Sequence, residues 1–224
     1  MKLAHSRKIA VAALCLALGA FNTVSFAKDE HSHGKGHGDH AHGDHAHGEH
    51  AGGAGHEMDP AAMEAWAAAA TPGPQHAGLA SRVGRWNAEV KSYWMDPNQP
   101  VVSAGTVEYS MELGGRVLNG AHKSEMMGMP FEGRSIDGYD NTKGSYWSIW
   151  LDNMGTGYMM CTGNFSADGK TGTFKGTSWD AMAGKEVTYK LITKIIDANK
   201  HVFEMYAIDG KNEIKQMEIT YTRG

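Results

Sequence analysis

The sequence predicts an all-β protein in which about ten antiparallel strands form an up-and-down meander. Apolar and polar residues alternate after Gly84, as in "TVEYSMEL" at 106–113, which puts Leu113 on the same face as Tyr109. Turn signals such as "DNTKG" at 140–144 separate the alternating segments, and no helical pattern lies between them. Because a long meander exposes two edges unless it closes, we expect a closed barrel, with an open or flattened β-sandwich as the alternative.

The positions of the turns define the individual strands. We expect them near 86–94, 106–113, 116–125, 131–139, 145–152, 157–166, 171–179, 185–196, 201–208 and 213–222. The first strand puts Trp86, Ala88 and Val90 on one face, and the last strand alternates Met217 and Tyr221 with polar neighbours. The strand "SYWSIWLD" carries large side chains on both faces, so either face could point inward.

Residues 1–27 have the features of a secretory signal peptide. A positively charged start is followed by the apolar run "IAVAALCLALGAF" and the small-x-small cleavage site Ser25-Phe26-Ala27. The apolar run is shorter than the roughly 20 residues that a spanning helix needs, so we expect no stable membrane insertion after cleavage. The mature chain would begin at Lys28 and be periplasmic or secreted. It would contain one cysteine, Cys161, which excludes an internal disulfide.

Residues 28–58 form a tail rich in histidine and glycine, with the repeat "DHAHG". This segment cannot bury enough apolar area to offset the entropy lost on ordering, so we expect a disordered, flexible tether. Its histidines are His31, His33, His37, His40, His42, His45, His47, His50 and His56. Neutral imidazoles on a flexible chain can gather around Zn²⁺, Cu²⁺ or Ni²⁺, so the tail is predicted to bind these ions. The alternative is a protonatable spacer. No cofactor is expected to be required.

Residues 59–84 are expected to form two short helices before the β domain of 85–224. Asp59 and Pro60 are an N-cap residue and a first-turn proline, and "AAMEAWAAAA" continues with strong helix formers. The prolines of "TPGP" end this helix. The second helix, "QHAGLASRV", should end at Gly84, because glycine readily adopts the left-handed conformation of a helix cap.

Several long segments resemble a bacterial family of proteins of unknown function, family 1579. They are "TPGPQHAGLASRVGRWNAEV", "LGGRVL", "MMGMPFEGRSIDGYDNTKGSYWSIWLDNMGTG", "FEMY" and "MEITYTR". The resemblance runs from about Thr71 to Arg223 in the family's order, and excludes the leader and the tail. It implies no activity, because the family has no assigned biochemical role.

The segment Gly84-Arg85-Trp86 carries a second resemblance, to lipocalin-like (calycin) barrels of the lipocalin or fatty-acid-binding type. Those barrels place a G-x-W sequence between a short helix and the first strand, as this chain does. The resemblance implies that Trp86 closes one end of the barrel. It also implies that a basic residue of the final strand packs over the tryptophan, and Arg223 could do so by a cation–π contact.

A barrel of this size has room for one small ligand if its interior is not filled by side chains. The aromatic and methionine side chains that could line such a space are Tyr109, Met111, Trp147, Trp150, Tyr158, Met160, Tyr189, Met205 and Tyr221. The alternative is that these residues simply form the core, because large apolar side chains are usually buried for stability alone.

Acidic residues in the family-like segment raise the possibility of catalysis. Asp137, Asp140 and Asp152, with Arg134 as a partner, could provide general acid–base groups. However, Asp140 and Asp152 occupy hairpin turns, where hydrogen bonds to the local backbone explain them. The chain contains no G-x-S-x-G elbow, P-loop or H-E-x-x-H motif. We therefore expect no enzyme, and no catalytic residue is predicted.

Other reactive side chains in the domain have ordinary explanations. His122 and His201 could ligate a metal or haem at a barrel mouth, but a hydrogen-bonded histidine is the simpler interpretation. Cys161 is expected to be a buried, unreactive thiol. The methionines of "MMGM" at 126–129 could bind Cu(I), but gap-filling by flexible side chains is the better explanation.

The sequence therefore predicts an exported, non-catalytic barrel that binds a small apolar ligand and carries a metal-binding tail. A periplasmic metal buffer or chaperone is the alternative, and an enzyme with an unrecognised pocket chemistry is the second alternative. The net charge of −4 leaves no basic excess, so no nucleic-acid partner is expected.

Overall fold

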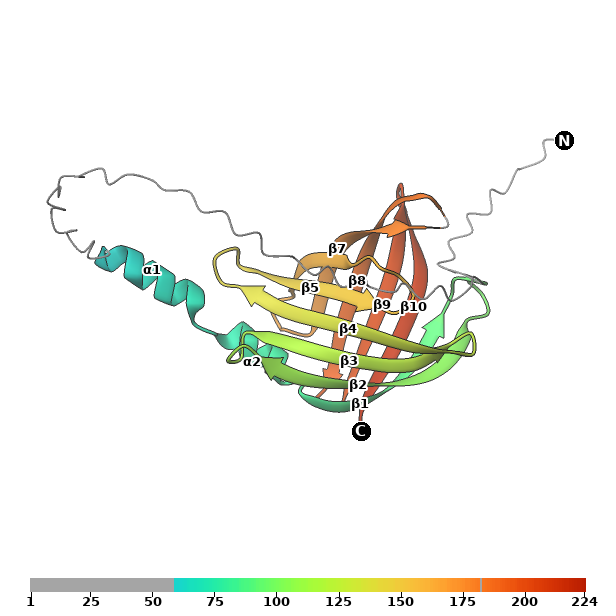
Figure 1. Ribbon diagram of the computed structural model, residues 1–224, viewed down its shortest axis with the longest axis horizontal. Helices are drawn as coiled ribbons and strands as arrows, with labels where there is room; N and C mark the ends of the chain where they lie inside the picture. The colour runs from blue at the N-terminus through green and yellow to red at the C-terminus, as the bar shows by residue number, and fades with distance from the viewer. Residues whose placement is uncertain (1–58, 182) are drawn as a thin grey trace, which may run out of the picture.

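The computed structural model describes residues 59–181 and 183–224, which form two helices and ten strands (Figure 1). The helices are α1 (Pro60–Ala70) and α2 (Pro74–Ala80). The strands are β1 (Gly84–Ser92), β2 (Val101–Glu112), β3 (Val117–Met126), β4 (Met129–Asp140), β5 (Ser145–Asp152), β6 (Met159–Phe165), β7 (Thr171–Asp180), β8 (Lys185–Asp197), β9 (Lys200–Asp209) and β10 (Asn212–Arg223). The predicted signal peptide and histidine tail lie outside the described residues.

The strands form a closed antiparallel barrel in which each strand pairs with its neighbours in the sequence. Closure is made by β1 and β10, whose register pairs Trp86 with Arg223 and Ala88 with Tyr221. Figure 1 shows these two strands, from opposite ends of the described chain, side by side. The predicted all-β class and closed meander are confirmed, and the open sandwich is excluded.

The ends of several predicted elements differ from the structure, most clearly those of β2 and α2. Strand β2 begins at Val101, earlier than predicted, because 101–105 pairs with the second half of β1. Leu113 is exposed, since β2 ends at Glu112 and the next residues turn with positive φ. Helix α2 ends at Ala80, and Gly84 has a φ of 112° where it opens β1. Alternation therefore identifies the strand interiors, whereas turn geometry sets their ends.

Helix α1 rides outside the barrel and has no buried residue. Figure 1 shows it projecting away from the strands. Two side chains from hairpin turns hold its last turn: Arg116 Nη2 donates to Ala70 O at 2.7 Å, and Asn141 Nδ2 donates to Thr71 O at 2.8 Å. These bonds satisfy carbonyls that the end of a helix leaves without an intrahelical partner. No described helix has the length and apolar character needed to cross a membrane.

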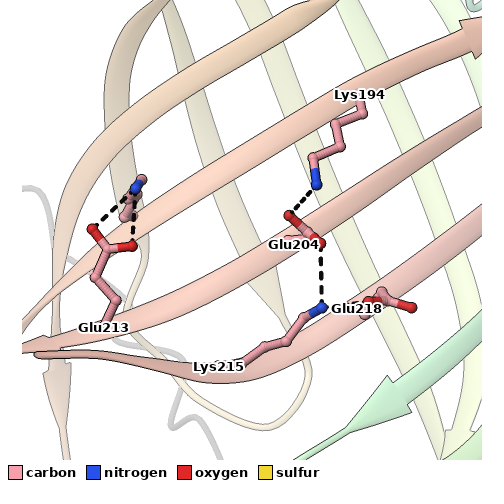
Figure 2. Close-up of polar contacts among 6 residues, drawn as sticks. Lys194, Glu204, Glu213, Lys215 and Glu218 are labelled. Atoms are coloured by element: carbon pink, nitrogen blue, oxygen red, sulfur yellow. Dashed lines mark hydrogen bonds and ion pairs between the residues drawn. The ribbon is translucent and has the colours of Figure 1, made fainter.

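Charged side chains form a network on the outer face of the barrel wall (Figure 2). Glu204 on β9 lies between two lysines, with Lys194 Nζ at 2.9 Å and Lys215 Nζ at 3.2 Å. Lys215 also contacts Glu218 on its own strand. Burial alone would raise the pKa of Glu204, but hydrogen bonds from both lysines outweigh it and lower that pKa below its ordinary value. The network ties together β8, β9 and β10.

Candidate functional site

One end of the barrel, called here the closed end, is sealed by Trp86, Arg223 and the segment that joins α2 to β1. The Trp86 indole is 2% exposed, and its Nε1 donates to Arg82 O at 2.7 Å. Arg223 Cζ lies 4.3 Å from the Trp86 ring centroid. The Arg223 guanidinium also donates to Val83 O at 3.0 Å and to Ala198 O. The last strand, the β8–β9 turn and the start of β1 are thus held together over the tryptophan.

A cavity occupies the barrel interior above the closed end. Its larger lobe has a volume of about 390 Å³, and an adjoining lobe measures about 320 Å³. The two lobes share Trp94, His122, Met126, Phe131, Trp150, Met217, Ile219 and Tyr221 in their linings. These volumes are in the range of small-molecule sites, so the interior is not filled by its own side chains.

Most side chains predicted to line a ligand space lie on the cavity wall. Tyr109, Trp147, Trp150, Tyr189, Met205 and Tyr221 line the larger lobe. Met111 packs against the core cluster at the closed end and is absent from both linings. The prediction is wrong for Tyr158 and Met160, which are 66% and 48% exposed. Cys161 points inward on β6, so its neighbour Met160 must point outward, and Tyr158 precedes the strand.

The strand "SYWSIWLD" resolves into an inner and an outer face. The ring of Trp150 covers Gly133 of the neighbouring strand β4 on the inner face of the barrel, and the ring of Trp147 covers Gly138 of the same strand. A Cβ at either glycine would collide with the indole, so glycine is needed for this close approach. Trp147 lies three positions from Trp150 on β5 and therefore on the opposite, outer face, where its ring covers Gly138, although the residue still borders the cavity.

The cavity floor, meaning the part next to the closed end, is polar. Arg82 Nη2 lies 3.3 Å from Asp137 Oδ2, and Arg82 Cζ lies 5.6 Å from the Tyr109 ring centroid. His122 Nε2 lies 3.3 Å from Ser135 Oγ. All these residues line the larger lobe, which therefore combines apolar walls with a few convergent polar groups.

Two more aromatic residues complete the floor. The imidazole of His201 stacks on Tyr221, with ring centroids 4.5 Å apart. The same imidazole meets Trp86 edge-on at 4.6 Å. His201 thus sits between the tryptophan that seals the barrel and the tyrosine that faces the cavity.

The histidines and tyrosines of the floor are uncharged near neutral pH. Burial, with the nearby charge of Arg82, lowers the pKa of His122 to about 4 and that of His201 to about 3. Burial raises the pKa of Tyr109 and Tyr221 well above the ordinary value. The four side chains therefore present neutral hydrogen-bonding groups rather than charges.

The acidic residues considered for catalysis do not converge. Asp140 Oδ1 accepts from the backbone N–H groups of Thr142 and Lys143. Asp152 accepts from Trp150 Nε1 at 2.7 Å and from a backbone N–H in its turn. Hydrogen bonding lowers the pKa of Asp140, as expected of a turn residue. Only Asp137 reaches the floor.

Arg82 and Ser135 are the floor residues that the sequence analysis missed. Arg134, considered as the partner of the three carboxylates, points outward and is exposed. Arg82 takes that place from the turn after α2. Arg82 lies three residues after Leu79, a buried residue of α2, and residues three apart share a helix face. This spacing was the signal in the sequence that Arg82 faces the barrel interior.

The described residues offer no grouping of three or more His, Cys, Asp or Glu side chains that could hold a metal ion. Cys161 is buried, and burial raises the pKa of its thiol to about 11. Met126 lines both lobes of the cavity, and Met127 borders the smaller lobe although it is largely exposed at the β3–β4 turn. Met129 is exposed and lines neither lobe. The predicted metal-binding histidines at 31–56 lie outside the described residues, and their role stays a prediction.

The end opposite α2, called here the open end, forms the mouth of the cavity. Trp94 and Met154 lie in the β1–β2 and β5–β6 loops and line the larger lobe. Trp179, at the end of β7, also lines the lobe. Trp179, Met95 and Met127 are largely exposed around this end. Apolar side chains thus surround the entrance to an apolar interior.

The sequence profile of the family described as "Protein of unknown function (DUF1579)" matches residues 71–223. The chain belongs to this family. The DUF1579 region covers α2 and the whole barrel and leaves out α1. The family's description assigns no activity, so the site must be interpreted from its own geometry.

Solved structures resemble the DUF1579 barrel in shape. The crystal structure of Rv2717c from M. tuberculosis superposes with a TM-score of 0.51 and 14% identity, covering 69% of this chain and 99% of that chain. A redesigned β-barrel, b11L5F_LGL, gives a TM-score of 0.35 and 12% identity, covering 66% of this chain and 95% of that one. At such identity the first likeness shows the fold alone. No curated protein matches the chain.

Proposed function

We propose that this DUF1579 protein is an exported, non-catalytic binding protein that holds a small apolar or amphipathic molecule inside its barrel. The observation that supports this most is the cavity of about 390 Å³, which opens at one end between apolar side chains. An apolar interior that side chains leave unfilled to this extent forgoes the dispersion contacts of a packed core. A ligand that fills the space would restore those contacts and remove its own apolar surface from water.

The floor geometry favours binding over catalysis. Ser135 and His122 stand at a nucleophile–base distance, but within residues 59–181 and 183–224 no carboxylate orients the other imidazole nitrogen of His122. With a pKa of about 4, His122 is a weak base at neutral pH. The thiol of Cys161 has a raised pKa, which makes it a poor nucleophile.

Native mass spectrometry of the full chain, purified without added ligand, tests the proposed function. We expect a mass above that of the bare chain, and we expect denaturation in organic solvent to release a small apolar molecule. If the native mass equals that of the bare chain, and incubation with a total lipid extract adds nothing, the proposed function is wrong.

We also propose that the histidine tail binds divalent metal ions in the exported protein, where it would act as a metal buffer beside the barrel. Its support is the sequence, in which nine histidines lie between His31 and His56. Calorimetric titration of the full chain with Zn²⁺ and Cu²⁺, compared with a variant in which these histidines are asparagine, tests it. Equal heats from both proteins would contradict metal binding by the tail.

A further inference from the structure

The floor of the cavity holds hydrogen-bonding groups that other described residues leave without partners. Tyr109 and Tyr221 are each 5% exposed, and His201 is 3% exposed. All three line the larger lobe. They touch aromatic rings, but in the described part of the chain no hydrogen bond reaches their hydroxyl groups or the His201 ring nitrogens. Since the three residues line the cavity, a ligand bound there can supply the missing hydrogen-bond partners.

These unpartnered groups lie close together. His122 stands between the two tyrosines, with ring centroids 5.8 Å from Tyr109 and 6.4 Å from Tyr221. Tyr221 in turn stacks on His201. A single polar group at the floor could therefore meet several of them at once. Tyrosine hydroxyls donate and accept, and a neutral imidazole offers one donor and one acceptor.

The charges of the lining disfavour an anionic group at this place. Arg82 is the one cation among the described residues that line the larger lobe. It already forms an ion pair with Asp137, whose Oδ2 lies 3.3 Å from Arg82 Nη2. Asp152, toward the open end, adds a second carboxylate to the lining of the same lobe. A carboxylate that entered the floor would have to displace Asp137 from Arg82, or remain buried without a cation beside it. Either outcome costs free energy that an uncharged group does not cost.

We propose that the ligand's recognised end is an uncharged group that both donates and accepts hydrogen bonds, such as a hydroxyl or amide, and that carboxylates are discriminated against. This inference rests on the proposed function, because it specifies which class of molecule the same cavity takes. Phe174, Leu191 and Phe203 face the apolar body of the ligand along the wall. Asp137 acts as the specificity-determining residue, since it neutralises Arg82.

Three probes that differ only in their polar end test this inference on the full chain: decanol, decanamide and decanoate. Each is titrated at neutral pH against protein loaded with the uncharged fluorescent probe N-phenylnaphthylamine. We expect decanol and decanamide to displace the probe at concentrations about tenfold lower than decanoate, which corresponds to about 1.4 kcal/mol.

The variant Asp137→Asn frees the charge of Arg82 and should abolish the preference for the uncharged probes. We expect the affinity for decanoate to rise by about tenfold, with a change of less than about threefold for decanol. Glu132→Gln is the matched control, because Glu132 is an exposed acid on the same strand. It should leave the ranking unchanged.

The outcomes separate the two proposals. If decanoate binds tighter than decanol to the unaltered chain, or if N-phenylnaphthylamine binds and none of the three displaces it, the inference is overturned while the binding function stands. If neither N-phenylnaphthylamine nor any of the three binds, the proposed function itself fails. Should Asp137→Asn prove unfolded, the ranking on the unaltered chain decides alone.

Discussion

The two ends of the barrel are built on different principles. At the closed end, Trp86 is sealed beneath Arg223, and the guanidinium donates to backbone carbonyls from two separate turns. At the open end, large apolar side chains such as Trp179, near the end of β7, and Met127, in the β3–β4 turn, remain exposed. The core cluster of Leu79, Trp86 and their neighbours lies at the closed end. Stability is therefore concentrated at one end, and access to the cavity at the other.

A pair of tryptophan substitutions should reveal this difference most strongly. Trp86→Ala removes a side chain that is 2% exposed, so we expect it to lower the free energy of unfolding by about 3–5 kcal/mol. Trp179→Ala removes one that is 67% exposed at the open end, and its effect should stay below about 0.5 kcal/mol. Urea unfolding measures both. Equal losses would show that the two ends contribute alike.

The pH dependence of stability should report on the histidines of the floor. Their folded pKa values, about 4 for His122 and about 3 for His201, lie below the ordinary 6.5. Below pH 6.5 the unfolded chain therefore binds protons that the folded chain does not. The free energy of unfolding should be highest above that pH and fall by about 1.4 kcal/mol per pH unit for each histidine as the pH drops toward 5.

The variants His122→Gln and His201→Gln provide the check on this slope. Each should flatten the decline between about pH 6.5 and 5 by about 1.4 kcal/mol per pH unit, as measured by urea unfolding at several pH values. Lower pH values are avoided because carboxylates then titrate as well. A slope that neither substitution changes would mean that both imidazoles are open to water at the floor.

The ion pairs on the outer face of the barrel wall should contribute less to the free energy of unfolding than the closed end does. Glu204 is nearly buried between Lys194 and Lys215, so Glu204→Gln should cost about 1–2 kcal/mol. Glu213 pairs with Lys190 and is half-exposed, so Glu213→Gln should cost less than about 0.5 kcal/mol. Thermal unfolding at low and moderate salt measures both. If Glu204→Gln lowered the free energy of unfolding as much as Trp86→Ala, the main stabilising contacts would lie in the wall and not at the closed end.

The sequence was sufficient to predict the strands because alternation is a local property. Trp86, Ala88 and Val107 are buried as their periodicity requires. The errors at Tyr158 and Met160 arose where β6 was extended toward its loop, and a side chain one position away from Cys161 faces outward. For "SYWSIWLD", only the neighbouring glycines of β4 show where each indole lies.

Tyr109 and Tyr221 were predicted to line a ligand space, but the contacts of the floor could not be predicted, because they join distant parts of the chain. Arg82 and Asp137 come from the α2–β1 turn and from β4, and His201 meets Trp86 only after β1 pairs with β10. Local sequence gives no reason to pair these residues. Closure of the barrel brings them together, and burial then removes the charge from the histidines.

Binding of N-phenylnaphthylamine to the full chain and to two threonine variants examines the cavity most directly. Thr193 on β8 lines the larger lobe, whereas Thr188 on the same strand is exposed. We expect Thr193→Trp to fill the cavity and weaken binding of the probe by about tenfold or more. The Thr188→Trp variant should bind the probe with the same affinity as the unaltered chain. Equal affinity in all three proteins, with both variants folded, would contradict binding inside the barrel.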